Sequence, residues 1–233
     1  MRKDTDKTLF FVIGSSRGLG KELVSCLKKI SGATIVAPQR SELDLSKLLQ
    51  KNALSRLFLP MCSAWDHVYL IANASVVEPI GQIGTLNSEE LAAHAHTNFV
   101  SYMQIINTFI AESRHISGEK KILAISSGAA ASAHEGLACY CATKAALEMF
   151  VRCIHKEQLQ RKNFQIMAFR PGVMDTDMQT RLREASAEEY PHRTLHSSGK
   201  LRSPKSVAQT IEALLLTKRY WNKPVRDITE FSL

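Results

Sequence analysis

The sequence predicts an α/β fold with a doubly wound parallel sheet flanked by helices. Short apolar runs alternate with longer segments whose apolar residues have helical spacing. Continuous apolar runs are typical of parallel strands buried on both faces, and strands that alternate with helices favour a parallel sheet. The chain has 233 residues, 45% of them hydrophobic, which is enough for one sizeable core. We therefore expect a single domain over residues 1–233.

The individual elements follow from apolar spacing and from the residues that begin them. Ser88 followed by two glutamates is typical of a helix start, and Pro204 suits the first turn of a helix. We expect strands at 9–13, 34–37, 66–73, 121–126, 164–170 and 227–228. We expect helices at 21–30, about 47–58, 88–114, 138–160, 175–189 and 204–217. The stretch 176–203 is the natural place for a mobile lid.

Composition and charge limit the function classes. No apolar run approaches the ~18 residues of a membrane-spanning helix, and the polar N-terminus lacks the pattern of a signal peptide. Five cysteines without a C-x-x-C pair indicate free thiols in a reducing compartment, so we expect a cytoplasmic protein without a metal site. The net charge of +8 permits nucleic acid as a partner, but no basic run is interleaved with aromatic residues. A phosphorylated dinucleotide suits a basic protein equally well.

A glycine-rich turn follows the first expected strand. It contains Gly14, Ser16, Arg17, Gly18, Leu19 and Gly20 and leads into a helix. Glycines let the backbone approach a pyrophosphate, whose negative charge is favoured by the free N–H groups at the helix start. The spacing G-x-x-x-G-x-G differs from the G-x-G-x-x-G fingerprint, and a glycine turn without a ligand is the alternative.

Two arginines indicate which dinucleotide would bind. Arg40 follows the second strand, where an acidic residue would hold a ribose 2′-hydroxyl and an arginine accommodates a 2′-phosphate. Together with Arg17, it favours NADP(H) over NAD(H). The alternative is that both arginines are simply solvated.

A proton-transfer group is predicted from Ser127, Tyr140 and Lys144. Tyr140 and Lys144 are four residues apart on an expected helix and therefore share a face. A nearby ammonium favours the phenolate and would lower the pKa of the phenol, which makes it a better proton donor to a carbonyl oxygen. Ser127 follows an apolar strand and could place its hydroxyl at the same spot. Alone, the Tyr-x-x-x-Lys spacing could equally arise by chance on a surface helix.

In this order, the motifs resemble the short-chain dehydrogenase/reductase family over nearly the full chain, which implies a Rossmann-like fold. The matching positions are Gly14, Gly18, Gly20, Asn73, Ala74, Asn98, Ser127, Tyr140, Lys144, Pro171, Gly172, Val173 and Thr176. The resemblance implies that Ser127, Tyr140, Lys144 and Asn98 are catalytic, with Asn98 holding a water that links Lys144 to solvent. It also implies that Asp44, Leu45 and Ser75 join the arginines, the glycine turn and the matching positions at the cofactor. Two helices, near 99–110 and 147–159, commonly pair across a homodimer in this family.

Shorter stretches, near 79–81, 173–179 and 199–204, resemble the sepiapterin reductase and benzil reductase branch. Those enzymes are NADPH-dependent carbonyl reductases of ketones and vicinal dicarbonyls, so the expected partner is a small carbonyl substrate, held by Ser127, Tyr140 and Asp227. Two departures from the family pattern are Ala72 with Ser75, in place of Asn-Asn-Ala-Gly, and a very short segment between Arg40 and Asp44. A non-catalytic NADP(H)-binding sensor or scaffold is the rival interpretation. His94 and His96 have no partners at metal spacing and are interpreted as ordinary helix residues, and Cys139 and Cys141 as buried apolar ones.

Overall fold

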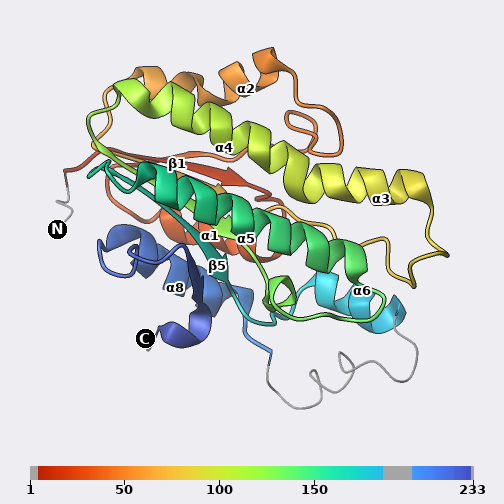
Figure 1. Cartoon of the computed structure of the whole chain (residues 1–233). Coiled ribbons are helices and arrows are strands. Elements are labelled where there is room, and N and C mark those ends of the chain that lie inside the picture. Colours follow the sequence, from red (N-terminus) through yellow and green to blue (C-terminus); the bar gives the residue numbers. More distant parts are fainter. Residues whose placement is uncertain (1–4, 186–200, 232–233) are drawn as a thin grey trace.

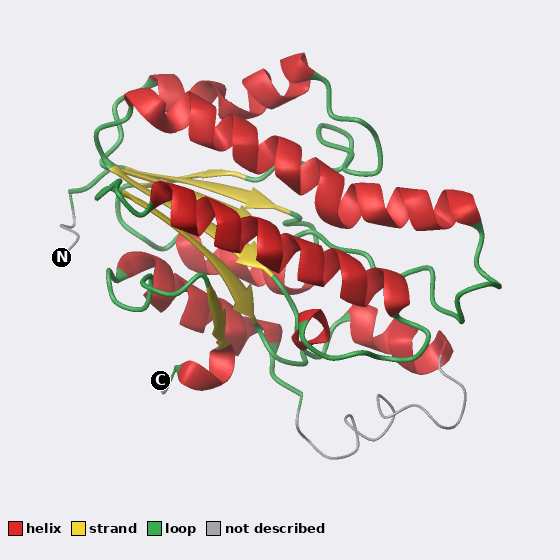
Figure 2. Cartoon of the chain, in the orientation of Figure 1, coloured by secondary structure: helices red, strands yellow, loops and turns green. Residues whose placement is uncertain are grey.

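A six-stranded parallel sheet forms the centre of the computed structural model, which describes residues 5–185 and 201–231 (Figures 1 and 2). The strand order is β2-β1-β3-β4-β5-β6, and each neighbouring pair is parallel. The strands are β1 (Thr8–Ile13), β2 (Ala33–Val36), β3 (His67–Ala72), β4 (Glu119–Ile125), β5 (Phe164–Arg170) and β6 (Val225–Asp227). The predicted doubly wound α/β fold is confirmed.

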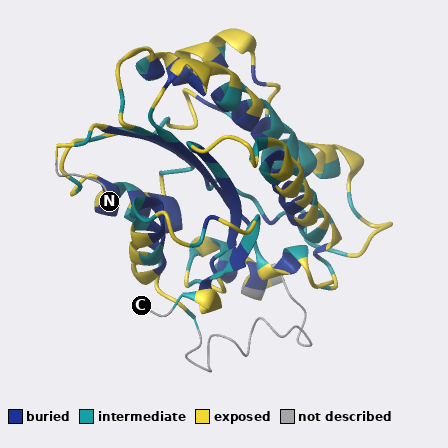
Figure 3. Ribbon diagram, turned by 60° about the vertical axis from the view of Figure 1, so that its left-hand side comes forward, coloured by how far each residue is buried: buried dark blue, intermediate teal, exposed yellow. Residues whose placement is uncertain are grey.

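Helices cover both faces of the sheet. They are α1 (Gly18–Leu27), α2 (Lys51–Phe58), α3 (Ser88–Ala95), α4 (Ser101–Glu112), α5 (Ala138–Gln158), α6 (Asp177–Ala185) and α8 (Pro204–Leu216). Side chains of β1 alternate between two cores, with Phe11 packed against α2 and α4 on one face and Phe10 in the core shared with α1 and α8 on the other. Figure 3 shows the strands as a buried layer between these helices. The apolar runs of the sequence correspond to this two-sided burial.

Two local features bear on the site. Between β2 and α2 there is a loop and no further strand or helix, as the short segment after Arg40 predicts. The predicted helix 88–114 is present, but a π-helical segment (His96–Val100) separates α3 from α4. Such segments are rare and occur frequently at functional sites. Most of the predicted lid, residues 186–200, lies outside the described residues. Within the described part, no helix is long and apolar enough to cross a membrane.

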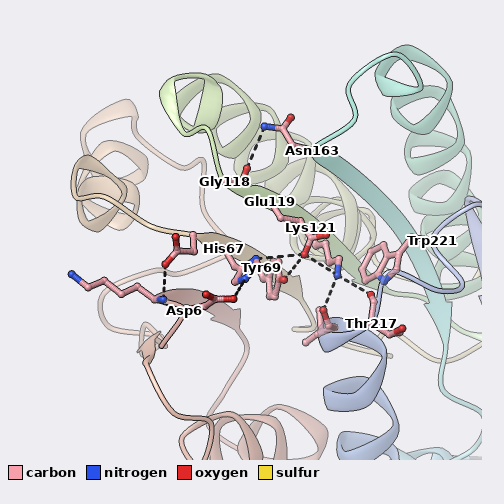
Figure 4. A network of polar contacts seen from close by, with 12 residues as sticks. Asp6, His67, Tyr69, Gly118, Glu119, Lys121, Asn163, Thr217 and Trp221 are labelled. Carbon is pink, nitrogen blue, oxygen red and sulfur yellow. Dashed lines mark hydrogen bonds and ion pairs between the residues drawn. The ribbon is translucent and has the colours of Figure 1, made fainter. Parts of the chain in front are cut away.

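The amino-terminal ends of β1, β3 and β4 carry a largely buried polar network (Figure 4). Glu119 receives a hydrogen bond of 2.6 Å from the hydroxyl of Tyr69 and lies 3.1 Å from the ammonium of Lys121. His67 lies 3.2 Å from Asp6 and 3.6 Å from Glu119. These contacts hold the pKa of Glu119 down at about 2, against desolvation, and raise the pKa of His67. The network therefore ties β1, β3 and β4 together at the end remote from the glycine turn.

Candidate active site

A hollow of about 680 Å³ opens at the carboxyl ends of the strands, beside the point where β2 and β3 flank β1. Ligands bind at such switch points in open α/β sheets. The hollow brings together most of the predicted site residues: Gly14, Ser16, Arg17, Gly18, Leu19, Arg40, Asp44, Leu45, Asn73, Ala74, Ser75, Ser127, Tyr140, Lys144, Pro171, Gly172, Val173, Thr176 and Asp227. Gly20 and Asn98 do not line it directly.

The glycine turn has the geometry that a pyrophosphate needs. Gly14 has a φ of +85°, and a Cβ there would come within 2.6 Å of Ala74. A Cβ at Gly20 would lie 1.9 Å from the carbonyl oxygen of Gly14, so Gly20 serves close packing and not ligand contact. No side chain caps the start of α1, and its first turn carries no acidic residue. Its N–H groups and helix dipole are therefore available to a phosphate, so the residues present fit a dinucleotide cofactor.

The two predicted cofactor arginines lie at the rim of this hollow. The side chain of Arg40 is 84% exposed and lies 3.6 Å from Asp44, while Arg17 lies 3.6 Å from Asp177. Exposed ion pairs of this kind contribute little to stability. Both guanidinium groups can therefore exchange these partners for a phosphate.

Ser127, Tyr140 and Lys144 meet at the inner end of the hollow. Tyr140 is 9% exposed and Lys144 is 2% exposed. The ammonium of Lys144 lies 5.7 Å from the centroid of the Tyr140 ring and donates a 2.9 Å hydrogen bond to the carbonyl oxygen of Ile125 at the end of β4. The Ser127 oxygen accepts from the backbone N–H of Ala129 at 3.2 Å, which leaves its own proton free to donate.

Burial dominates the acid–base properties of this group. It lowers the pKa of Lys144 to about 8, against the opposing attraction of Glu148. It raises the pKa of Tyr140, while the side chains of Ser127 and Ser75 act in the lowering direction. The expectation that Lys144 sets a lowered pKa for the phenol is therefore not met, because desolvation of the phenolate outweighs the other contributions.

Glu148 supports Lys144 from one helical turn further along α5. Its carboxylate is buried. It accepts two hydrogen bonds of 2.7 Å from Arg170 and one of 2.8 Å from Ser126. A bidentate arginine keeps such a carboxylate charged. The pair fixes the end of β5 just before Pro171 and provides the negative charge that faces Lys144.

Asn98 is completely buried, in the π-helical segment. Its amide nitrogen donates to the carbonyl oxygen of Val76 at 2.8 Å, and its oxygen accepts from the N–H of Val76 at 2.9 Å and from the hydroxyl of Ser75 at 3.2 Å. Asn98 thus acts on the loop after β3 and not on the hollow itself. The hydrogen bond from Ser75 connects Asn98 to a side chain that acts to lower the pKa of Tyr140.

His94 completes this polar group. It is 2% exposed, and its Nδ1 lies 2.6 Å from the carbonyl oxygen of Glu78. Its Nε2 lies 2.9 Å from the amide nitrogen of Asn98 and 3.1 Å from the Thr143 hydroxyl. Because Asn98 can only donate from that nitrogen, Nε2 must accept and the proton must be on Nδ1. Burial and the charge of Lys144 lower the pKa of His94, which keeps this tautomer neutral.

One part of the wall of the hollow is apolar. Ala129, Leu137 and Leu182 line it and, together with the buried Val77, pack with the ring of Tyr140. Met178 places its sulfur 4.0 Å from the Tyr140 oxygen. An exposed ion pair between Glu78 and Arg181 joins the loop after β3 to α6.

Comparison with known proteins identifies the family. The model of the family described as short chain dehydrogenase matches residues 63–187. A benzil reductase ((S)-benzoin forming) of Bacillus subtilis is 32% identical over 96% of this chain and 99% of its own length, and one of Bacillus cereus is 30% identical over 94% and 98%. The crystal structure of the KRED1-Pglu enzyme superimposes with a TM-score of 0.80 at 25% identity, over 94% of this chain and 100% of its own. The chain is a short-chain dehydrogenase/reductase.

Sequence reasoning missed two contributors to the site of this reductase. His94 is not the ordinary helix residue that the sequence predicts, and only its i, i+4 relation to Asn98 indicates a link. Glu148 stands in the same relation to Lys144. Asp227 does line the hollow, but its carboxylate accepts hydrogen bonds from Thr229, and so caps the turn after β6. Cys139 and Cys141 are half-buried, less buried than expected.

Proposed function

We propose that this short-chain dehydrogenase/reductase is a carbonyl reductase that uses NADPH to reduce a ketone or vicinal dicarbonyl. The observation that carries the proposal is one hollow that holds both the glycine turn and the buried set of Ser127, Tyr140 and Lys144. The glycine turn suits a dinucleotide phosphate, and the buried set suits proton delivery to a carbonyl oxygen.

In the proposed reaction, bound NADPH supplies the hydride to the carbonyl carbon. Tyr140 gives its phenolic proton to the carbonyl oxygen as negative charge develops there. Ser127 donates a hydrogen bond to the same oxygen, which strengthens in the transition state. Lys144, with its lowered pKa, faces the ring and stabilises the phenolate that remains. Asn98, Ser75 and His94 hold the loop against which Tyr140 packs.

The preference for NADPH over NADH rests on Arg17 and Arg40. Both lie at the rim of the cofactor end of the hollow, and each is engaged by only a weak, exposed ion pair. The neighbouring Asp44 is tied by its carboxylate to Ser46, with a hydrogen bond of 2.7 Å. An arginine pair free to reorient suits a ribose 2′-phosphate.

The substrate proposal rests on the apolar side chains of Ala129, Leu137, Met178 and Leu182, which line the hollow around the Tyr140 ring. An apolar surface beside a proton donor suits a bulky, uncharged ketone or 1,2-diketone. The two Bacillus relatives are named benzil reductases, which supports a diaryl diketone as a substrate class. Asp227, at the edge of the hollow, would accept a hydrogen bond from a polar substrate group.

The decisive experiment compares Tyr140→Phe with wild type in NADPH oxidation driven by benzil. We expect kcat to fall by at least ~100-fold while NADPH affinity is nearly unchanged, because only the proton donor is removed. Tyr220→Phe is the matched control and should keep full activity, since the Tyr220 ring packs on Phe231 and does not line the hollow. Retained activity in Tyr140→Phe would refute the assignment.

The second candidate is an NADP(H)-binding sensor or scaffold without turnover. Ser75 favours it, because a side chain stands where the family pattern has a glycine beside the cofactor. This function predicts tight NADPH binding without oxidation by any ketone, diketone or pterin. We also propose a homodimer that pairs through α4 and α5, because Met149 of α5 is 60% exposed. Light scattering would measure the oligomeric state. A cytoplasmic location fits the five free cysteines.

A further inference from the structure

Strand β4 contains two consecutive lysines, Lys120 and Lys121, whose side chains point to opposite faces of the sheet. Lys121 is fully partnered (Figure 4). Its ammonium lies 3.1 Å from Glu119, donates to the carbonyl oxygens of Leu215 and Thr217 at 2.8 and 2.9 Å, and lies over the rings of Tyr69 and Trp221. These contacts compensate the buried charge of Lys121, so its presence has a structural explanation.

Lys120 is buried without such compensation. It is 6% exposed, and its ammonium donates to the carbonyl oxygen of Ile116 at 2.5 Å. No carboxylate of the described residues pairs with it, and burial together with repulsion by Arg161 lowers its pKa. Buried charges are normally paired, because the desolvation cost is otherwise several kcal/mol. Lys120 is thus a buried cation without a counter-ion among the described residues.

A hollow of about 460 Å³ lies beside Lys120, at the amino-terminal ends of β4 and β5. The active site lies at the opposite, carboxyl-terminal ends of the strands. Its lining has three strongly basic side chains, Arg114, Lys120 and Arg161, and no acidic one. The other lining residues are Ser113, His115, Ile116, Ser117, Asn163 and Phe164. Neither Arg114 nor Arg161 forms an ion pair with a described carboxylate. The positive charge of this hollow is therefore uncompensated within the described part of the chain.

Backbone contacts fix the walls of this hollow. His115 lies 3.1 Å from the carbonyl oxygen of Met61, and Asn163 donates to the carbonyl oxygens of Ser117 and Gly118 at 3.0 and 3.3 Å. The N–H of Lys120 donates to the carbonyl oxygen of Asn163 at 2.8 Å. Figure 4 shows Asn163, just before β5, beside Gly118, just before β4. The site is thus preformed, which reduces the entropy lost on binding.

We propose that the hollow between Lys120, Arg114 and Arg161 binds a small phosphate-bearing molecule. Arginine forks match phosphate oxygens, and a buried ammonium supplies a point charge. A volume of 460 Å³ lies in the range of small-molecule sites and exceeds the need of one phosphate ion, so the ligand has an organic part, which would rest on Ile116 and Phe164. The site is independent of the proposed carbonyl reduction, because the two hollows lie at opposite ends of the strands.

The test is the melting temperature of the full chain at constant ionic strength, with ribose 5-phosphate or inorganic phosphate as the probe. A ligand that binds the native state raises the melting temperature with its concentration. The variants are Arg161→Gln and Lys120→Met. The matched control is Lys162→Gln, which removes an exposed charge outside the hollow. A second control is Arg40→Ala, which weakens phosphate binding at the cofactor site.

We expect ribose 5-phosphate to stabilise wild type, Lys162→Gln and Arg40→Ala at concentrations at least ~10-fold lower than those needed for Arg161→Gln or Lys120→Met. Inorganic phosphate should act at higher concentrations than the ester. Without probe, Lys120→Met should melt at or above wild type, because an unpaired buried charge has been removed. If Lys120→Met does not fold, Arg161→Gln alone decides.

Three results would overturn the proposal. The first is an equal response of Arg161→Gln and wild type to the probe. The second is a response lost only in Arg40→Ala, which would place the phosphate at the cofactor site. The third is no response of wild type up to ~10 mM. None of these results bears on Tyr140→Phe, so failure here is distinguishable from failure of the proposed function.

Discussion

Replacing Lys144 by methionine should abolish reduction and make the protein more stable at pH 7. Burial lowers the pKa of Lys144 from 10.5 to about 8. Each pKa unit corresponds to ~1.4 kcal/mol, so the charged ammonium costs the folded state about 3 kcal/mol. The substitution also leaves the Ile125 carbonyl oxygen without its donor, which costs ~1 kcal/mol. The net gain in the free energy of unfolding is therefore about 2 kcal/mol.

The sign of the pH dependence follows from the same pKa. Because the folded value is the lower one, the unfolded chain binds the proton more tightly, and the cost is fully present below pH 8. Wild type should therefore gain stability between pH 8 and about 10.5, so the advantage of Lys144→Met should shrink over that interval.

Urea unfolding at several pH values measures both effects, and NADPH oxidation measures the loss of activity. Lys156→Met removes an exposed charge from the same helix and should change neither stability nor activity appreciably. A Lys144→Met protein that is less stable than wild type at pH 7 would contradict the reasoning, since it would mean that Glu148 fully compensates the buried ammonium.

Three further predictions concern other residues. Arg40→Ala should weaken NADPH binding at least ~10-fold more than NADH binding in fluorescence titrations, and equal effects would remove the 2′-phosphate role. Ser75→Ala removes a hydroxyl that lowers the pKa of Tyr140, so the alkaline limb of the kcat profile for reduction should move to higher pH and kcat should fall a few-fold; an unchanged profile argues against this contact. The raised pKa of His67 stabilises the fold fully below pH 6.5, and this contribution is lost as pH rises through the folded value, so His67→Gln should flatten the urea stability profile above pH 6. A profile as steep as wild type would exclude His67 as its source.

The fold and most site positions were predictable because each rests on a short-range signal. Apolar runs indicated strands buried on both faces, and the glycines at 14, 18 and 20 indicated a turn whose backbone a phosphate can approach. The i, i+4 spacing predicted that Tyr140 and Lys144 share a face of one helix, which is α5. Each of these patterns lies within one element, so it can be recognised without knowing how the elements pack.

The features that sequence reasoning missed depend on contacts between elements. His94 joins α3, α5 and the loop after β3, and no spacing within α3 indicates that it would be buried. The π-helical segment arises where Asn98 turns its amide to the backbone of Val76. The pKa of Tyr140 is raised by burial that only the packed structure determines. Sequence-based expectations treated each of these residues within its own helix.

Three lysines are buried in the described part of the chain, and their partners separate structural from functional charges. Lys121 has a carboxylate, two carbonyl oxygens and two aromatic rings, so its charge needs nothing further. Lys144 donates to one carbonyl oxygen and is attracted by Glu148 without forming a direct ion pair, which leaves its ammonium free to stabilise a phenolate. Lys120 has a carbonyl oxygen and a repelling arginine. Because an uncompensated buried charge destabilises the fold, its presence is best explained by a counter-charge that arrives with a ligand, and the same logic that marks Lys144 as functional applies to Lys120.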